Sequence, residues 1–96
     1  MENKKLYKLE KIAIAYHPGE MLEEKLSEMG IAAKEFAKMI GKDTNFVESL
    51  IAGNISVTPD IANDLEKATL IPAHMWIKRQ RSFDKYQEEK IGELAN

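Results

Sequence analysis

The polar residues most able to do chemistry lie in two sets between residues 34 and 54. The first set lies on the helix expected over residues 44–52, on the face opposite its apolar residues. Its members are Thr44, Asn45, Glu48 and Ser49. An Asn side chain can pair with adenine, Ser and Thr suit either base type, and Glu can accept from a cytosine amine. The second set carries groups that bind phosphate oxygens: Lys34, Lys38, Lys42 and Asn54. Together they predict a surface that reads bases and holds the DNA backbone.

Each set also has a simpler interpretation. The three lysines recur every four residues, so they share one face of the helix expected there, and this face could equally be solvated. Glu48 could repel phosphates rather than read a base. Phe46 could contact a thymine methyl or be a partly covered surface aromatic.

The sequence contains no recognisable pattern of catalytic or metal-binding residues. It has no cysteine, and its two histidines, His17 and His74, are far apart, so we expect no metal or cofactor. Glu23 and Glu24 are adjacent on a helix and point in different directions, which excludes an acid–base pair. No nucleophile triad, phosphate loop or dinucleotide motif is present. His17 is instead expected to cap the first helix, and Trp76 and Phe83 to lie in the core or at a dimer surface.

Length and charge set the remaining bounds. Ninety-six residues make one domain, and a net charge of −2 requires any DNA-binding face to be local. The absence of cysteine fits a reducing compartment. The apolar runs are too short to span a bilayer. We therefore expect a cytoplasmic protein without a membrane partner.

Five helices must position these side chains, and together they predict an all-α fold. Their expected ranges are 18–29, 32–40, 44–52, 59–68 and a longer helix opened by Pro72 that runs towards Ile91. Pro18 and Pro59 suit first helical turns, Asp43 and Thr58 suit N-caps, and Gly30 suits a helix end. The segment before His17 alternates apolar residues, so residues 1–16 are expected to form a short strand or an arm ahead of a domain of residues 17–96.

The second and third helices have the spacing of a helix-turn-helix. Phe36 and Ala37 precede a turn at Gly41, and Val47 and Leu50 follow on the next helix. Ala37 must be small because the next helix crosses over it, and Gly41 tolerates the positive φ of a tight turn.

Several short motifs resemble one family. They are His17-Pro18-Gly19-Glu20, Gly30-Ile31, Lys34-Glu35-Phe36-Ala37, Leu50-Ile51-Ala52-Gly53, Val57-Thr58-Pro59, and Met75-Trp76 followed by Gln80. Together they resemble the HigA-type antitoxins of the lambda-repressor-like (Xre) helix-turn-helix superfamily, over His17 to about Tyr86. The resemblance implies a homodimer that binds a pseudo-palindromic operator, represses its own toxin–antitoxin operon and neutralises a RelE-like mRNA interferase.

Three positions depart from that family pattern. Ala32-Ala33 stand where the family usually has Ser-Gln, which removes an N-cap and a DNA contact. Lys42 replaces an apolar residue, and Leu70 replaces a glycine before the last helix. The fold expectation survives these changes. Two alternatives therefore stay open: a free-standing regulator without a toxin, and an interaction module that no longer reads DNA.

The resemblance also directs attention to surfaces for a toxin. RelE-like toxins are basic, and acids lie on the first and fourth helices: Glu20, Glu23, Glu24, Glu28, Asp60, Asp64 and Glu66. These could equally be solubility and helix-dipole charges. Apolar anchors for tight binding could come from the N-terminal arm: Leu6, Tyr7, Leu9, Ile12, Ile14 and Tyr16.

Overall fold

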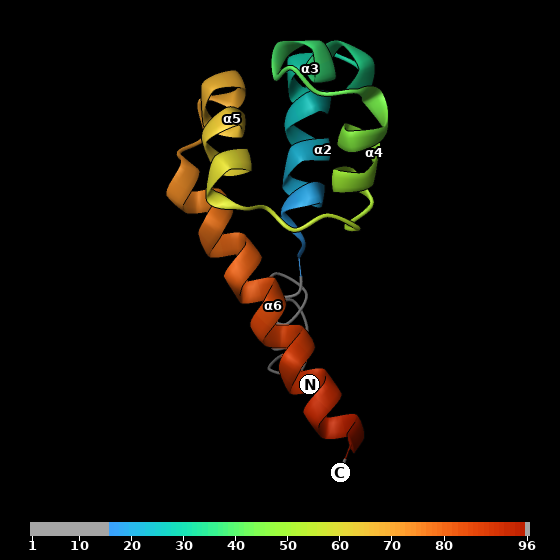
Figure 1. Ribbon diagram of the computed structural model, residues 1–96, viewed down its shortest axis with the longest axis vertical. Coiled ribbons are helices and arrows are strands. Elements are labelled where there is room, and N and C mark those ends of the chain that lie inside the picture. Colours follow the sequence, from blue (N-terminus) through green and yellow to red (C-terminus); the bar gives the residue numbers. More distant parts are fainter. Residues whose placement is uncertain (1–15, 96) are drawn as a thin grey trace, which may run out of the picture.

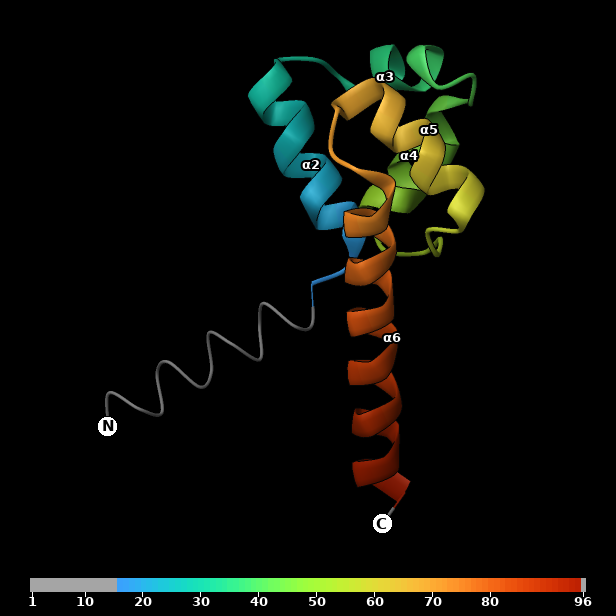
Figure 2. The same ribbon diagram turned by 90° about the vertical axis from the view of Figure 1, so that its left-hand side faces the viewer.

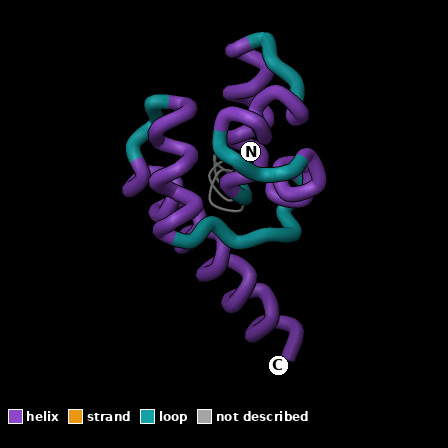
Figure 3. Tube along the Cα trace, turned by 45° about the horizontal axis from the view of Figure 1, so that its top comes forward, coloured by secondary structure: helices purple, strands orange, loops and turns teal. Residues whose placement is uncertain are grey.

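Five helices make up the part of the chain that the structure describes. The computed structural model describes residues 16–95, and side chains for residues 16–89. The helices are α2 (Pro18–Met29), α3 (Ala33–Met39), α4 (Thr44–Ile51), α5 (Pro59–Thr69) and α6 (Ala73–Ala95). Within that range no residue forms a strand (Figure 3). The all-α, five-helix prediction is confirmed. Of residues 1–16, which were expected to form an arm or a short strand, all but Tyr16 lie outside the described residues.

The ends of the helices follow the capping residues of the sequence. The Nδ1 atom of His17 accepts a hydrogen bond from the backbone N–H of Gly19 at 2.9 Å, and Pro18 opens α2. Thr58 Oγ1 accepts from the N–H of Ile61, which caps α5. Gly30 ends α2 with φ of 69°, in the left-handed conformation that glycine adopts at little cost.

Helices α2 to α5 surround one core. Its buried apolar residues are Leu22, Leu26, Phe36, Ala37, Val47, Leu50, Val57, Ala62, Leu65 and Trp76. Each helix contributes to this set, as the apolar spacing predicts. Ile51 and Ile61 are only half-buried and pack against the edge of this core.

The last helix lies partly outside this body. Its first turns pack beside α5, and the rest projects away as a single rod (Figures 1 and 2). It begins at Ala73, one residue later than the expected start at Pro72. Among the described residues, no helix is both long enough and apolar enough to cross a membrane.

Candidate nucleic-acid interface

The helix-turn-helix is formed by α3, a four-residue link and α4. Gly41 has φ of 68°, and the backbone N–H of Lys42 donates to the carbonyl of Ala37 at 2.9 Å. The chain thus folds back tightly after α3, and Ala37 is 2% exposed beneath the turn. The predicted roles of Gly41 as the turn and Ala37 as a small buried residue are confirmed.

Helix α4 has one buried and one exposed face. Asp43 Oδ1 accepts from the N–H of Phe46 at 2.8 Å and fixes the start of the helix. Val47 and Leu50 are completely buried, while Asn45 and Glu48 are exposed on the other side. Three residues separate Asn45 from Glu48, so the two lie one turn apart on the same face.

Thr44 and Ser49 are less available than the sequence indicated. Both are half-buried, so they flank the exposed face rather than form it. Phe46 is also half-buried, as one of its two interpretations requires. The exposed part of α4 therefore presents one amide and one carboxylate at its centre.

The lysines do not all belong to one helix face. Lys34 and Lys38 are exposed on α3, four residues apart. The prediction that Lys42 shares their face was wrong, because α3 ends at Met39 and the turn at Gly41 redirects the chain. Lys42 instead lies between the two helices, with its Nζ atom 5.4 Å from the centre of the Phe46 ring. It still lies beside the start of α4.

Asn54, the remaining residue predicted to bind phosphate, lies in the loop just after α4. Gly53 has φ of 84°, and the N–H of Asn54 donates to the carbonyl of Ser49 at 2.9 Å. Asn54 is exposed. At the opposite end of the motif, Ala32 precedes α3 with extended φ and ψ and makes no side-chain cap, as its type predicts.

The position of α4 depends on two residues whose packing the sequence did not reveal. A Cβ atom on Gly19 would lie 1.9 Å from the carbonyl oxygen of Leu50 and 2.8 Å from that of Ile51. The first turn of α2 therefore touches the backbone at the end of α4. The His17 ring lies next to this contact: a Cβ atom added to Gly53 would be 3.6 Å from the ring. The ring also packs edge-on against Phe83, with ring centres 4.9 Å apart.

His17 is thus a junction between three segments. It caps α2, contacts the loop after α4 and packs on α6. Because Nδ1 accepts a hydrogen bond, the neutral ring carries its proton on Nε2. Burial lowers the pKa of His17 below its usual 6.5, and a hydrogen bond with the backbone of Ile55 and the carboxylates of Asp84 and Glu20 offset part of this effect.

Gln80 is a second residue whose role needed the fold. Its Oε1 atom accepts from the N–H of Val57 at 2.8 Å, and its Nε2 donates to Asp84 at 2.9 Å. Trp76 is fully buried, and its Nε1 donates to the carbonyl of Ile71. Gln80 therefore joins α6 to the segment between α4 and α5. The sequence motifs included Trp76 and Gln80 but did not predict these hydrogen bonds.

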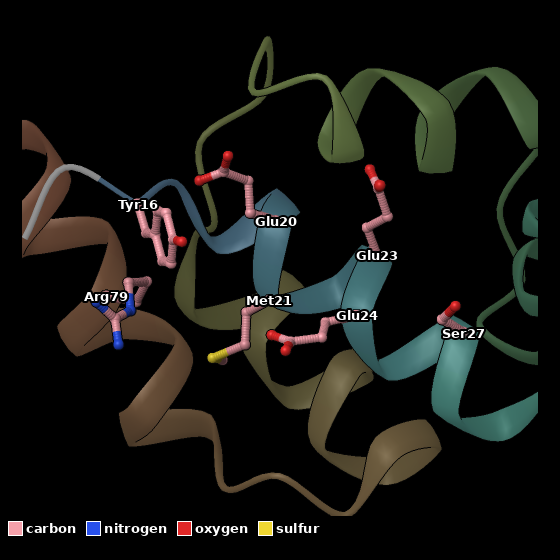
Figure 4. A pocket seen from close by; sticks show the side chains of 7 residues that line it. All are labelled: Tyr16, Glu20, Met21, Glu23, Glu24, Ser27 and Arg79. Atoms are coloured by element: carbon pink, nitrogen blue, oxygen red, sulfur yellow. The ribbon is translucent and has the colours of Figure 1, made fainter. Parts of the chain in front are cut away.

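An acidic hollow lies between α2 and α6. Its volume is about 630 Å³, and its lining consists of Tyr16, Glu20, Met21, Glu23, Glu24, Ser27 and Arg79. Figure 4 shows the glutamates along α2, with Tyr16 and Arg79 at one end. Tyr16 is 45% exposed there. Within the described part of the chain, no cluster of three or more His, Asp or Glu residues is arranged to hold a metal ion.

Comparison with known proteins agrees with this architecture. An addiction-module antidote protein of the HigA family from Coxiella burnetii is 31% identical, with a TM-score of 0.76; the match covers 82% of this chain and 88% of that one. The chain belongs to the HigA family. A putative antidote protein of a plasmid maintenance system from Nostoc punctiforme is 27% identical, with a TM-score of 0.71, over 84% of this chain and 94% of that one.

A regulator is also similar in sequence. The HTH-type transcriptional regulator YddM of Escherichia coli K12 is 26% identical over 85 residues, which are 88% of this chain and 90% of that protein. No protein-family model matches the chain. The HigA-family chain is therefore an antitoxin of the addiction-module type with a helix-turn-helix domain, and its relatives are antidotes and regulators rather than enzymes.

Proposed function

We propose that this HigA-family chain binds DNA through α4 and represses the operon that encodes it and its toxin. The observation that carries the DNA part is the two-faced α4: Asn45 and Glu48 are exposed while Val47 and Leu50 on the opposite face are fully buried. A helix held in this way can enter a major groove and present side chains to base edges.

The proposed contacts divide into two kinds. Asn45 is the main base-reading residue, Glu48 accepts from a cytosine amine, and Thr44 and Ser49 contribute from the flanks. Lys34, Lys38, Lys42 and Asn54 hold phosphates on either side of the groove. A homodimer would place two such helices on one side of the duplex, so the half-sites should be about 10 base pairs apart or a multiple of that.

The test is a gel shift with the DNA upstream of the chain's own gene, repeated over a range of salt. Binding that weakens steeply with salt and protects a pseudo-palindrome supports repression. Absence of any specific shift would favour the alternative, an interaction module that no longer reads DNA. The exposed Glu48 and the net charge of −2 support this alternative because negative charge repels phosphates.

The second half of the proposal concerns a toxin. We infer a basic, RelE-like mRNA interferase, because the resemblance implies one and because α2 offers acids around the hollow described above. Exposed charges speed association but add little affinity. Apolar anchors would come from residues 1–15, which lie outside the described residues.

Deletion of residues 1–15 tests this division of labour. The truncated chain should keep its helical content and DNA binding while losing affinity for the toxin. Retention of toxin at full affinity would move the interface to the acidic helices or to α6. A neighbouring reading frame that does not encode a small basic protein would favour a free-standing regulator instead.

A further inference from the structure

One turn in the middle of α6 holds the loop that joins α4 to α5. Gln80 Oε1 accepts from the backbone N–H of Val57 at 2.8 Å, near the end of this loop. Phe83 packs edge-on against His17, whose ring lies beside Gly53 at the start of the loop. Both ends of the loop are therefore tied to the same turn of α6.

The amide of Gln80 satisfies its two neighbours in one orientation only. The N–H of Val57 can only donate, and the ionised carboxylate of Asp84 can only accept. The amide oxygen must therefore face Val57, and the amide nitrogen must face Asp84. The structure has this arrangement, with Gln80 Nε2 donating to Asp84 Oδ1 at 2.9 Å. An exposed carboxylate on α6 thus fixes which end of a buried amide faces the loop.

The loop depends on this hydrogen bond because both partners are buried. Val57 and Gln80 are each 5% exposed, so water does not readily replace the amide oxygen. Without Asp84, the Gln80 amide can turn over and place its own N–H groups against the N–H of Val57. That donor is then left without an acceptor, which is costly in a buried position. The loop must shift to satisfy it.

A shift of the loop reaches the proposed DNA interface. Asn54, which is proposed to hold a phosphate, lies in the loop three residues before Val57. Its backbone N–H donates to the carbonyl of Ser49 on α4 at 2.9 Å. Movement at Val57 therefore displaces a phosphate contact and the end of the helix that carries the base-reading residues. Contacts of this kind lose strength when the residues that support them move by even a small distance.

We propose that Asp84 is a positioning residue for DNA binding: by orienting Gln80, it holds the loop after α4 in the shape that the operator requires. The inference rests on the proposed function and adds to it a residue outside the helix-turn-helix. The Asp84 carboxylate would repel phosphates if it met them directly. Its favourable effect on binding therefore acts through Gln80.

The test compares operator binding by Asp84→Ala and by Glu88→Ala, a matched control one turn further along α6. Both residues are exposed, and both changes remove one negative charge. Charge alone predicts that each variant binds DNA as tightly as wild type or more tightly. Positioning predicts that Asp84→Ala alone binds about tenfold more weakly, the factor that one net hydrogen bond supplies. Asp84→Asn should recover most of the affinity, because its Oδ1 still accepts from Gln80.

Two conditions and one further measurement separate positioning from a loss of fold. Binding is measured where circular dichroism shows every variant fully folded, and at about pH 8, where burial keeps the His17 ring neutral by lowering its pKa. Amide hydrogen exchange, followed by NMR, reports on the loop itself. The N–H of Val57 should exchange faster in Asp84→Ala and at the wild-type rate in Glu88→Ala and Asp84→Asn.

Three results would overturn the proposal. These are equal operator affinities for Asp84→Ala and Glu88→Ala, a wild-type rate of Val57 exchange in Asp84→Ala, and an Asp84→Asn variant that binds as weakly as Asp84→Ala. Failure of the proposed function gives a different pattern: the wild-type chain then binds no operator, although Val57 exchange still responds to Asp84→Ala.

Discussion

Gly19 gives a sharp prediction because two physical effects oppose each other there. Glycine inside a helix costs about 0.5–1 kcal/mol relative to alanine, so propensity alone predicts that Gly19→Ala stabilises the protein. The structure predicts the reverse, since the added Cβ would lie 1.9 Å from the Leu50 oxygen and 2.8 Å from the Ile51 oxygen. Ordinary contacts of this kind begin near 3.4 Å.

The clash cannot be relieved by a side-chain rotation. Both neighbours are backbone atoms at the end of α4, so α2 and α4 must move apart. Overpacking of a tight core typically costs about 1–3 kcal/mol, and rigid backbone on both sides places this site at the upper end. After the gain in propensity, we expect a net loss of about 2 kcal/mol. For a domain of this size that lowers the melting temperature by roughly 8–16 °C.

The assay is thermal unfolding followed by circular dichroism, with Ser27→Ala as control. Ser27 is exposed on the same helix, so its replacement should change the free energy of unfolding by no more than about 0.5 kcal/mol. Gly19→Ala should also weaken operator binding, because the end of α4 is displaced. A Gly19→Ala variant that melts at or above the wild-type temperature would refute the close approach of α2 to α4.

Two further predictions concern helix starts. The free energy of unfolding should fall as the pH drops from about 7 to 5.5, because the unfolded chain protonates His17 near its ordinary pKa of 6.5 while burial lowers the pKa in the folded chain. Urea titrations should show this loss in wild type and a flatter profile in His17→Asn, which keeps a capping oxygen that does not titrate; equal profiles would exclude His17 as the cause. Ala32→Ser should raise the free energy of unfolding by about 1 kcal/mol, since Ala32 already has the extended backbone of an N-cap. An unchanged urea midpoint would show that α3 gains nothing from a cap.

The sequence predicted best those features that depend on near neighbours. The caps at Asp43 and Thr58 act on backbone groups three residues away, and the turn at Gly41 depends on its own φ. Residue type and short spacing therefore suffice to identify them. The same holds for the buried and exposed faces of α4, which follow helical periodicity.

Contacts between segments that are distant in the chain could not be predicted from residue type and short spacing. Gln80 bonds to Val57 across 23 residues, and Gly19 touches Leu50 through backbone atoms that carry no sequence signal. The four-residue spacing of the lysines was misleading for Lys42, because the helix ends before it. Periodicity states which residues would share a face only if the helix continues.

The central claim is that the exposed face of α4 reads bases while the lysines hold phosphates. Fluorescence anisotropy with a library of operator variants over a range of salt tests it most directly. Asn45→Ala should cost about 1–3 kcal/mol on the preferred operator and relax base preference at one position. Lys38→Ala should weaken binding to all sequences alike and reduce the salt slope by about one. Wild-type affinity, preference and salt slope in both variants would contradict the claim.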